Sequence, residues 1–198
     1  IAIFSILRGM NGGVKLLSNV NMFFAGLLLF FVIVAGPTVG IFKSMFDTLI
    51  YSVPDSLQLT NWVGRSDEKF FHDWTIFYWA WWIAWSPFVG MFIAKISKGR
   101  TIRQFMMGVL IAPFSIGLVW FTAFGETAIS QFEDKIGDLS IGMSDSSLTL
   151  FQMLNSLPYS EVTSVIAIFL LIIFIVTSAD SGSLVVDSLT SGTQKDTP

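Results

Sequence analysis

Long apolar runs, separated by short polar stretches, dominate this chain of 198 residues. Four of the runs reach the roughly 20 residues that a helix needs to cross the apolar part of a bilayer. They predict membrane-spanning helices over residues 21–46, 74–96, 105–124 and 160–187. Residues 1–9 have the pattern of a helix end closed by Gly9. The sequence therefore predicts an all-α integral membrane protein.

Helix-breaking residues lie inside three of the predicted spans. Gly36-Pro37 falls in the second half of the first span, Pro87 in the second and Pro113 in the third. Because apolar residues continue past each of them, we expect bends rather than helix ends. Pro87 has no N–H to donate, so it also frees the carbonyl of Ile83, and such a group needs protein or a water-lined cavity at membrane depth.

Three segments connect the predicted spans. Residues 47–73 read as an amphipathic interfacial helix, over Asp47–Leu57, followed by a loop with charges of both signs. Residues 125–159 read as a long external loop with five acids and a short helix over residues 148–154. The third segment has four cations and no acid: Lys95, Lys98, Arg100 and Arg103. The positive-inside rule places this Lys95–Arg103 loop in the cytoplasm. We expect a multi-pass protein of the inner (plasma) membrane.

Composition excludes several classes of protein. The mean hydropathy is +0.70 and 13% of residues are charged, against about a quarter in soluble domains. The net charge of −3 and the absence of a basic stripe give no sign of a nucleic-acid partner. The chain has no cysteine, so disulfide and thiol chemistry are absent. It does not begin with Met, and we interpret it as an internal piece of a longer polytopic protein.

Five of the seven tryptophans fall within twelve residues of the second predicted span. On a helix, the i, i+3, i+4, i+7 spacing brings four aromatic residues to one face. These are Tyr78, Trp81, Trp82 and Trp85, with Trp74 close to the same face and Trp79 pointing elsewhere. An aromatic wall beside a helix break suits a quaternary or tertiary ammonium ligand. The alternative is an interfacial aromatic belt, which fits Trp62, Trp74 and Trp120 better than the deeper tryptophans.

The last predicted span becomes polar at its C-terminal end, where Thr177, Ser178 and Asp180 follow an apolar run. The hydroxyls could bond back to carbonyls one turn earlier, as is common in membrane helices. They could also coordinate a hard cation together with backbone carbonyls. Asp180 favours a functional role because acids within a membrane are costly, but it could equally cap a helix end or pair with an arginine elsewhere.

The sequence does not predict an enzyme. His72 is the only histidine, lies in an expected loop and has no Cys or His partner, so a metal site is not expected. No Ser/His/Asp set and no Gly-rich phosphate loop is present. No cofactor is expected, apart from a possible coupling ion.

Four stretches together resemble the betaine/choline/carnitine transporter (BCCT) family. They are Phe77–Arg103, Val176–Ser181, Lys15–Asn21 and Gly36–Thr38, and the long tryptophan-rich stretch is the most specific. The resemblance implies a LeuT-type fold of two inverted five-helix repeats with the substrate near the midplane. On that mapping the chain holds the end of core helix four and core helices five to eight.

The resemblance also implies which residues bind substrate and ions. The aromatic box would comprise Trp81, Trp82 and Trp85, with Phe77 as a gate-like neighbour and Tyr78 beside them. A sodium site would use the carbonyl of Phe174 with Thr177 and Ser178, and Phe88 would line a second ion region. The rest of both sites would come from core helices one and two, outside this chain.

The implied function is secondary active uptake of an onium osmolyte, such as glycine betaine, choline or carnitine, driven by an ion gradient. The family includes proton-coupled members and antiporters, and the hydroxyl pair favours sodium here. The implied partners are the onium substrate and the lipid bilayer, with a homotrimer as the assembly found in the family. The alternative is a membrane receptor or osmosensor that binds an onium ligand without transporting it.

Overall fold

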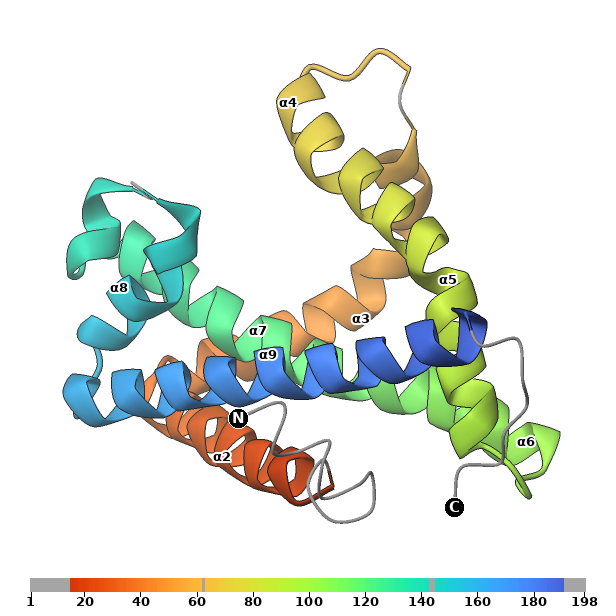
Figure 1. Cartoon of the computed structure of the whole chain (residues 1–198). Coiled ribbons are helices and arrows are strands. Elements are labelled where there is room, and N and C mark those ends of the chain that lie inside the picture. The colour runs from red at the N-terminus through yellow and green to blue at the C-terminus, as the bar shows by residue number, and fades with distance from the viewer. Residues whose placement is uncertain (1–14, 62, 143–144, 191–198) are drawn as a thin grey trace. The chain divides into compact units, whose positions relative to one another are not determined.

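The computed structural model describes residues 15–61, 63–142 and 145–190, and all regular secondary structure in these ranges is helical (Figure 1). The expected helix end at residues 1–9 and Trp62 lie outside the described residues. The elements in chain order are α2 (Lys15–Ala35), α3 (Thr38–Thr60), α4 (Glu68–Phe70), the π-helical turn η2 (Phe71–Ile76), α5 (Phe77–Ile96), α6 (Ile102–Met106), the π-helical turn η3 (Met107–Ile111), α7 (Ala112–Glu133), the 3-10 turns η4 (Asp138–Ile141) and η5 (Ser146–Leu148), α8 (Thr149–Asn155) and α9 (Ser160–Thr190).

Four helical stretches among the described residues are long and apolar enough to cross a membrane. They are Leu16–Ala35, Glu68–Ala94, Ile102–Glu133 and Ser160–Asp180, and each overlaps one of the spans expected from the sequence. The prediction of an all-α membrane protein is confirmed.

The first expected span, over residues 21–46, is two helices rather than one bent helix. α2 ends at Ala35, and α3 begins at Thr38 and runs on to Thr60, so the expected interfacial helix is the later part of α3. Pro37 has no N–H to continue the ladder. The Thr38 hydroxyl donates to the Ile33 carbonyl at 2.7 Å and satisfies a carbonyl at the end of α2. Gly36-Pro37 therefore ends one helix and starts another.

Two segments expected to be loops are helical. Residues 68–73 begin the second candidate span as α4 and the first part of η2, where Lys69 and Asp73 form an i, i+4 ion pair that supports a helix. His72 consequently lies in helix, not in a loop. Residues 125–133 extend α7 to Glu133, because this part of α7 packs on α2 and α3 as described below. The short helix expected over residues 148–154 is present as α8.

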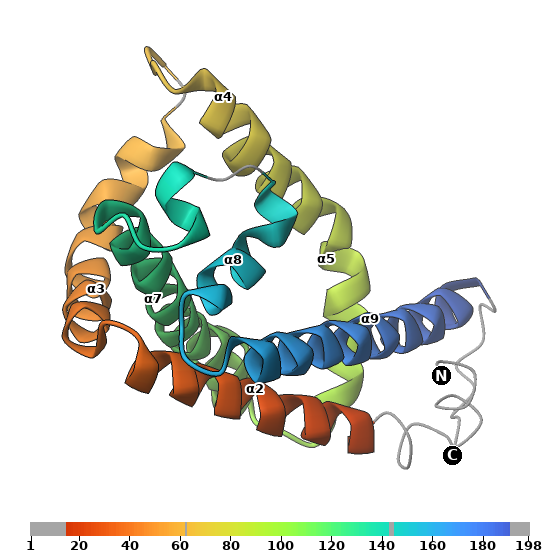
Figure 2. The same ribbon diagram turned by 90° about the vertical axis from the view of Figure 1, so that its left-hand side faces the viewer.

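The chain divides into two compact units, Ile1–Met45 with Phe114–Leu184, and Phe46–Pro113 with Val185–Pro198. The buried core of the first unit joins α2, the start of α3, α7, η4, α8 and α9. Its members are Leu28, Val32, Ile41, Leu139, Met153, Leu154, Ala123 and Ala167. α2 and α9 lie side by side in Figures 1 and 2, and the rings of Phe24 and Phe169 meet edge to face at 5.6 Å.

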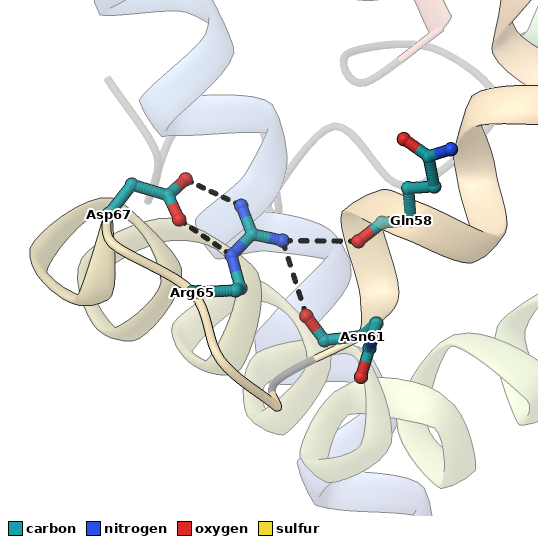
Figure 3. Close-up of polar contacts among 4 residues, drawn as sticks. All are labelled: Gln58, Asn61, Arg65 and Asp67. Atoms are coloured by element: carbon teal, nitrogen blue, oxygen red, sulfur yellow. Dashed lines mark hydrogen bonds and ion pairs between the residues drawn. The ribbon is translucent and has the colours of Figure 1, made fainter.

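In the second unit, Arg65 fixes the turn that joins α3 to α4 (Figure 3). Its guanidinium donates to both carboxylate oxygens of Asp67, at 2.7 and 2.5 Å, and to the carbonyls of Gln58 and Asn61 at 3.4 and 3.5 Å. It also lies over the ring of Phe71, 5.2 Å from the centroid. The hydrogen bond from Arg65 lowers the pKa of Asp67 below its ordinary value, and Asp67 raises the pKa of Arg65. One side chain thus ties the end of α3 to the start of the tryptophan-rich helix.

The bend expected at Pro113 coincides with a change in the helical ladder. The π-helical turn η3 ends at Ile111, directly before Ala112 and Pro113. Since Pro113 cannot donate to the carbonyl four residues earlier, the ladder shifts register there, which is a common origin of a kink.

Candidate functional site: an aromatic row and hollow on α5

Five aromatic side chains form a continuous row along α5 and the turn before it. Trp74 stacks on Tyr78, with centroids 5.9 Å apart and planes at 9°. Tyr78 meets Trp81 at 5.9 Å, Trp81 meets Trp85 at 6.1 Å, and Trp85 meets Phe88 at 5.2 Å, each close to edge to face. The spacings of three and four residues place these rings on one face of the helix. We call Trp74, Tyr78, Trp81, Trp85 and Phe88 the aromatic row.

A hollow of about 420 Å³ opens beside this row and is lined by Tyr78, Trp79 and Trp82. Trp82 continues from the row, with its ring 6.4 Å from that of Trp81. Trp79 was expected to point away from the face of Tyr78, Trp81 and Trp85, and it is not part of the row; it lines the hollow beside the row, a role that was not expected from the sequence. The i, i+3 spacing of Trp79 and Trp82 was the signal that could have identified it.

The hollow offers aromatic surface rather than charge. Trp79 and Trp82 are 60% and 66% exposed within the chain. Residues 74–125 contain no Asp or Glu, so no carboxylate of this segment is present to attract a cation. Ring faces remain as the attractive groups, and they bind cations through their quadrupoles. The volume falls within the range of small-molecule sites, roughly 300–1,000 Å³.

Phe77 lies at the start of α5, next to the row. Its ring meets Tyr78 edge to face at 5.6 Å and 89°, and its side chain is exposed. Phe77 therefore contacts one of the residues that line the hollow, and its role as a gate-like neighbour stays a prediction. Phe88, assigned by the resemblance to an ion region, belongs to the aromatic row through its contact with Trp85.

The carbonyl that Pro87 leaves without an N–H partner is satisfied locally. The Ser86 hydroxyl donates to the Ile83 carbonyl at 2.9 Å. α5 accordingly continues through Pro87 to Ile96 without a break. A serine before a proline gives this helix a substitute donor where the backbone has none.

Thr177 and Ser178 lie within α9. The Thr177 hydroxyl is 3.0 Å from the Ile173 carbonyl and 3.1 Å from the Phe174 carbonyl. The structure thus brings Phe174 and Thr177 together through a bond back along the helix. Ser178 is the next residue and is exposed.

Asp180 lies one turn beyond Thr177 and is 1% exposed. Neither carboxylate oxygen has a hydrogen-bond partner among the described residues. α9 continues to Thr190, so the interpretation of Asp180 as the cap of a helix end is wrong. Its pairing with an arginine stays a prediction.

The described residues contain no group of three or more His, Cys, Asp and Glu side chains that could hold a metal ion. His72 is placed with its ring 6.0 Å from that of Phe71. The aromatic hollow on α5 is therefore the candidate site with the clearest chemistry.

Known proteins match this chain over its whole length. A family profile described as "BCCT, betaine/carnitine/choline family transporter" matches residues 1–198. A glycine betaine/proline/choline/ectoine transporter of Vibrio parahaemolyticus is 49% identical over 201 residues, which cover 100% of this chain and 35% of the relative. Glycine betaine transporter 1 of the same organism is 48% identical, with 100% and 38% covered.

The glycine betaine transporter OpuD of Bacillus subtilis is 42% identical over 186 residues, which cover 92% of this chain and 36% of the relative. The chain spans about a third of the length of these curated relatives. A profile match over its whole length shows where it belongs: this chain is a member of the betaine/carnitine/choline family of transporters.

Proposed function

We propose that this chain forms part of a secondary active transporter that takes up an onium osmolyte, such as glycine betaine, choline or carnitine, driven by an ion gradient. The observation that carries the proposal is the acid-free aromatic hollow of Tyr78, Trp79 and Trp82 beside the aromatic row. The relatives are named as transporters of betaine and choline, which favours transport over the receptor alternative.

The substrate's methylated head explains the need for aromatic walls. A quaternary ammonium has no N–H to donate, so hydrogen-bond acceptors gain little from it, whereas a ring face attracts its spread positive charge. Each desolvated cation–π contact contributes up to about 2 kcal/mol. In this proposal Trp82 of the hollow and Trp81 and Trp85 of the row form the box, since the Trp81 ring contacts both other indoles. Tyr78 and Trp79 stand beside them as the rest of the hollow's wall, and Phe77 closes one side.

Sodium is the proposed coupling ion. A small hard cation prefers oxygen ligands, and α9 supplies the Phe174 carbonyl and the Thr177 hydroxyl 3.1 Å apart, with Ser178 adjacent. The Thr177 hydroxyl keeps lone pairs on its oxygen while it donates to a carbonyl of the preceding turn, so the same oxygen remains able to bind an ion. Phe88 is proposed to line a second ion region. Alternating access around the loaded site would then move substrate and ion together.

The proposal also covers the orientation of the protein in the membrane, its location and its assembly. The Lys95–Arg103 loop would face the cytoplasm, because cations concentrate in the cytoplasmic loops of membrane proteins. The protein would work in the plasma membrane as a homotrimer, with osmoprotection as its role.

Uptake by the full-length protein in proteoliposomes tests the proposal. Radiolabelled glycine betaine, choline, carnitine and proline would be offered with and without an inward sodium gradient, and equilibrium binding would be measured on the same preparation. We expect accumulation of at least one onium compound that requires the gradient. Saturable binding without flux, or accumulation indifferent to every ion gradient, would contradict it.

A further inference from the structure

A second hollow, of about 500 Å³, lies at the other end of α5, around the start of α6. It is lined by Arg100, Arg103, Gln104 and Met107. Both arginines are exposed. The hollow therefore presents two guanidinium groups and one amide around a common space.

Among the residues that the structure describes, neither arginine has an acidic partner. The ion pairs found among the described residues are Arg65–Asp67 and Lys69–Asp73, and neither involves this hollow. Residues 74–125 contain no acid. A cluster of unneutralised guanidinium groups repels itself and attracts anions, and phosphate oxygens match the fork of each guanidinium.

The backbone holds these side chains in position. Gly99 adopts a φ of +84°, which favours glycine, and the Arg100 N–H donates to the Ser97 carbonyl at 3.0 Å. Thr101 and Gln104 form a capping box: the Gln104 side-chain oxygen accepts from the Thr101 N–H at 3.1 Å. This bond occupies the oxygen of the Gln104 amide and leaves its NH₂ end to donate.

Met107 lines the hollow, and further exposed apolar side chains lie along the same helical stretch. Ile102 is 83% exposed, and Met106, Met107 and Leu110 are also exposed. They lie in the first part of the candidate span Ile102–Glu133, where a spanning helix passes from the headgroup region into the acyl-chain region of the bilayer. An anion at this hollow would thus have hydrocarbon directly beside it.

We propose that the Arg100–Met107 hollow binds the phosphate headgroup of an anionic phospholipid. The two guanidinium groups donate to the phosphodiester oxygens, and the Gln104 amide adds a further donor. Ile102, Met107 and Leu110 contact the acyl chains. The apolar neighbours select a lipid over free phosphate, since a soluble anion gains nothing from them.

Native mass spectrometry of the full-length protein tests this binding without requiring transport. The protein would be titrated with phosphatidylglycerol and, separately, with phosphatidylcholine and with inorganic phosphate. The test variant is Arg100→Gln/Arg103→Gln, and the matched control is Lys98→Gln, which removes an exposed cation of the same loop outside the hollow. Size-exclusion profiles establish that each variant is folded.

The wild-type protein and Lys98→Gln should bind phosphatidylglycerol tightly. The affinity of the double variant for this lipid should be lower by roughly tenfold or more, as expected for two lost cations near a membrane. Arg100→Lys/Arg103→Lys should keep part of the affinity, because charge remains and bidentate bonding is lost. Equal losses in Lys98→Gln and the double variant would show diffuse attraction and overturn the proposal. Competition by inorganic phosphate as effective as that by lipid would overturn it too.

Discussion

Thr127 on α7 lies directly against Gly36 at the end of α2. A Cβ on Gly36 would stand 2.7 Å from the Thr127 hydroxyl oxygen and equally close to the Val32 carbonyl. One turn further along, a Cβ on Gly40 would stand 2.9 Å from a carboxylate oxygen of Glu126. Two glycines therefore let α7 approach the junction of α2 and α3, and this packing explains why α7 continues into residues expected to be a loop.

Gly36→Ala should destabilise the protein by about 1–3 kcal/mol, the usual cost of adding a methyl group to a packed contact. The clash is with Thr127 and with backbone, so a rotamer change alone does not relieve it. Gly26→Ala in α2 is the control, because a Cβ on Gly26 would meet nothing within 4 Å. We expect that control to be neutral or slightly stabilising. Thermal unfolding in detergent measures both, and equal melting temperatures would contradict the packing argument.

Ser44 and Glu126 should be energetically coupled across the same contact. The Ser44 hydroxyl donates to the Glu126 carboxylate in a partly buried setting. A hydrogen bond to a charged group contributes about 1.5–3 kcal/mol, so Ser44→Ala should lower stability by an amount that vanishes in a Glu126→Ala background. A double-mutant cycle of unfolding free energies measures the coupling. Additive single effects would show that the two side chains act independently.

The parts of this structure that follow from local periodicity could be predicted, and those set by distant partners could not. The aromatic row from Tyr78 to Trp85 follows from the 3.6-residue period alone. The helical state of Glu126 depends on Ser44 and Gly40, which lie far away in the sequence, and no local pattern reports them. Pro37 predicted an irregularity in the helix at this position. Whether the helix bends or ends there depends on the Thr38 hydroxyl and on the packing of Gly36, which the sequence pattern does not show.

Trp79 and Trp82 should both contribute to onium binding. The structure places both indoles in the wall of the hollow, whereas the helical-wheel argument put Trp79 on another face. Loss of one cation–π contact of up to about 2 kcal/mol should raise the KM for the substrate by up to roughly thirtyfold. Trp74→Ala is the control, since Trp74 belongs to the row but does not line the hollow. The measurement is the KM for uptake in each variant. A Trp79→Ala variant with the same KM as Trp74→Ala would show that Trp79 takes no part in onium binding.

The turn between α3 and α4 should loosen in acid. Because Arg65 lowers the pKa of Asp67 below its ordinary value of 3.8, the folded state holds the Asp67 carboxylate ionised more firmly than the unfolded chain does. The resulting contribution to stability is fully present above pH 3.8 and is lost as the pH falls through the lower folded pKa. Hydrogen-exchange protection factors at residues 63–67, which correct for the intrinsic pH dependence of exchange, should therefore fall in that window. Asp67→Asn should already have low protection factors there at neutral pH and lack the transition, and an identical acid transition in that variant would assign it to another group.

Comparing Thr177→Ala with Thr163→Ala should show whether Thr177 is an ion ligand or a threonine that only bonds back to its own helix. The Thr177 hydroxyl bonds back to the Ile173 and Phe174 carbonyls, and Thr163 on the same helix makes the same kind of bond to the Tyr159 and Ser160 carbonyls. Both substitutions remove a bond within one helix, so each should change the melting temperature only slightly. If Thr177 binds sodium, only Thr177→Ala should raise the sodium concentration that half-activates uptake. The two threonines share the same local bonding. If Thr163→Ala raises the half-activating sodium concentration equally, or Thr177→Ala does not raise it, then the Thr177 hydroxyl only bonds back to its own helix.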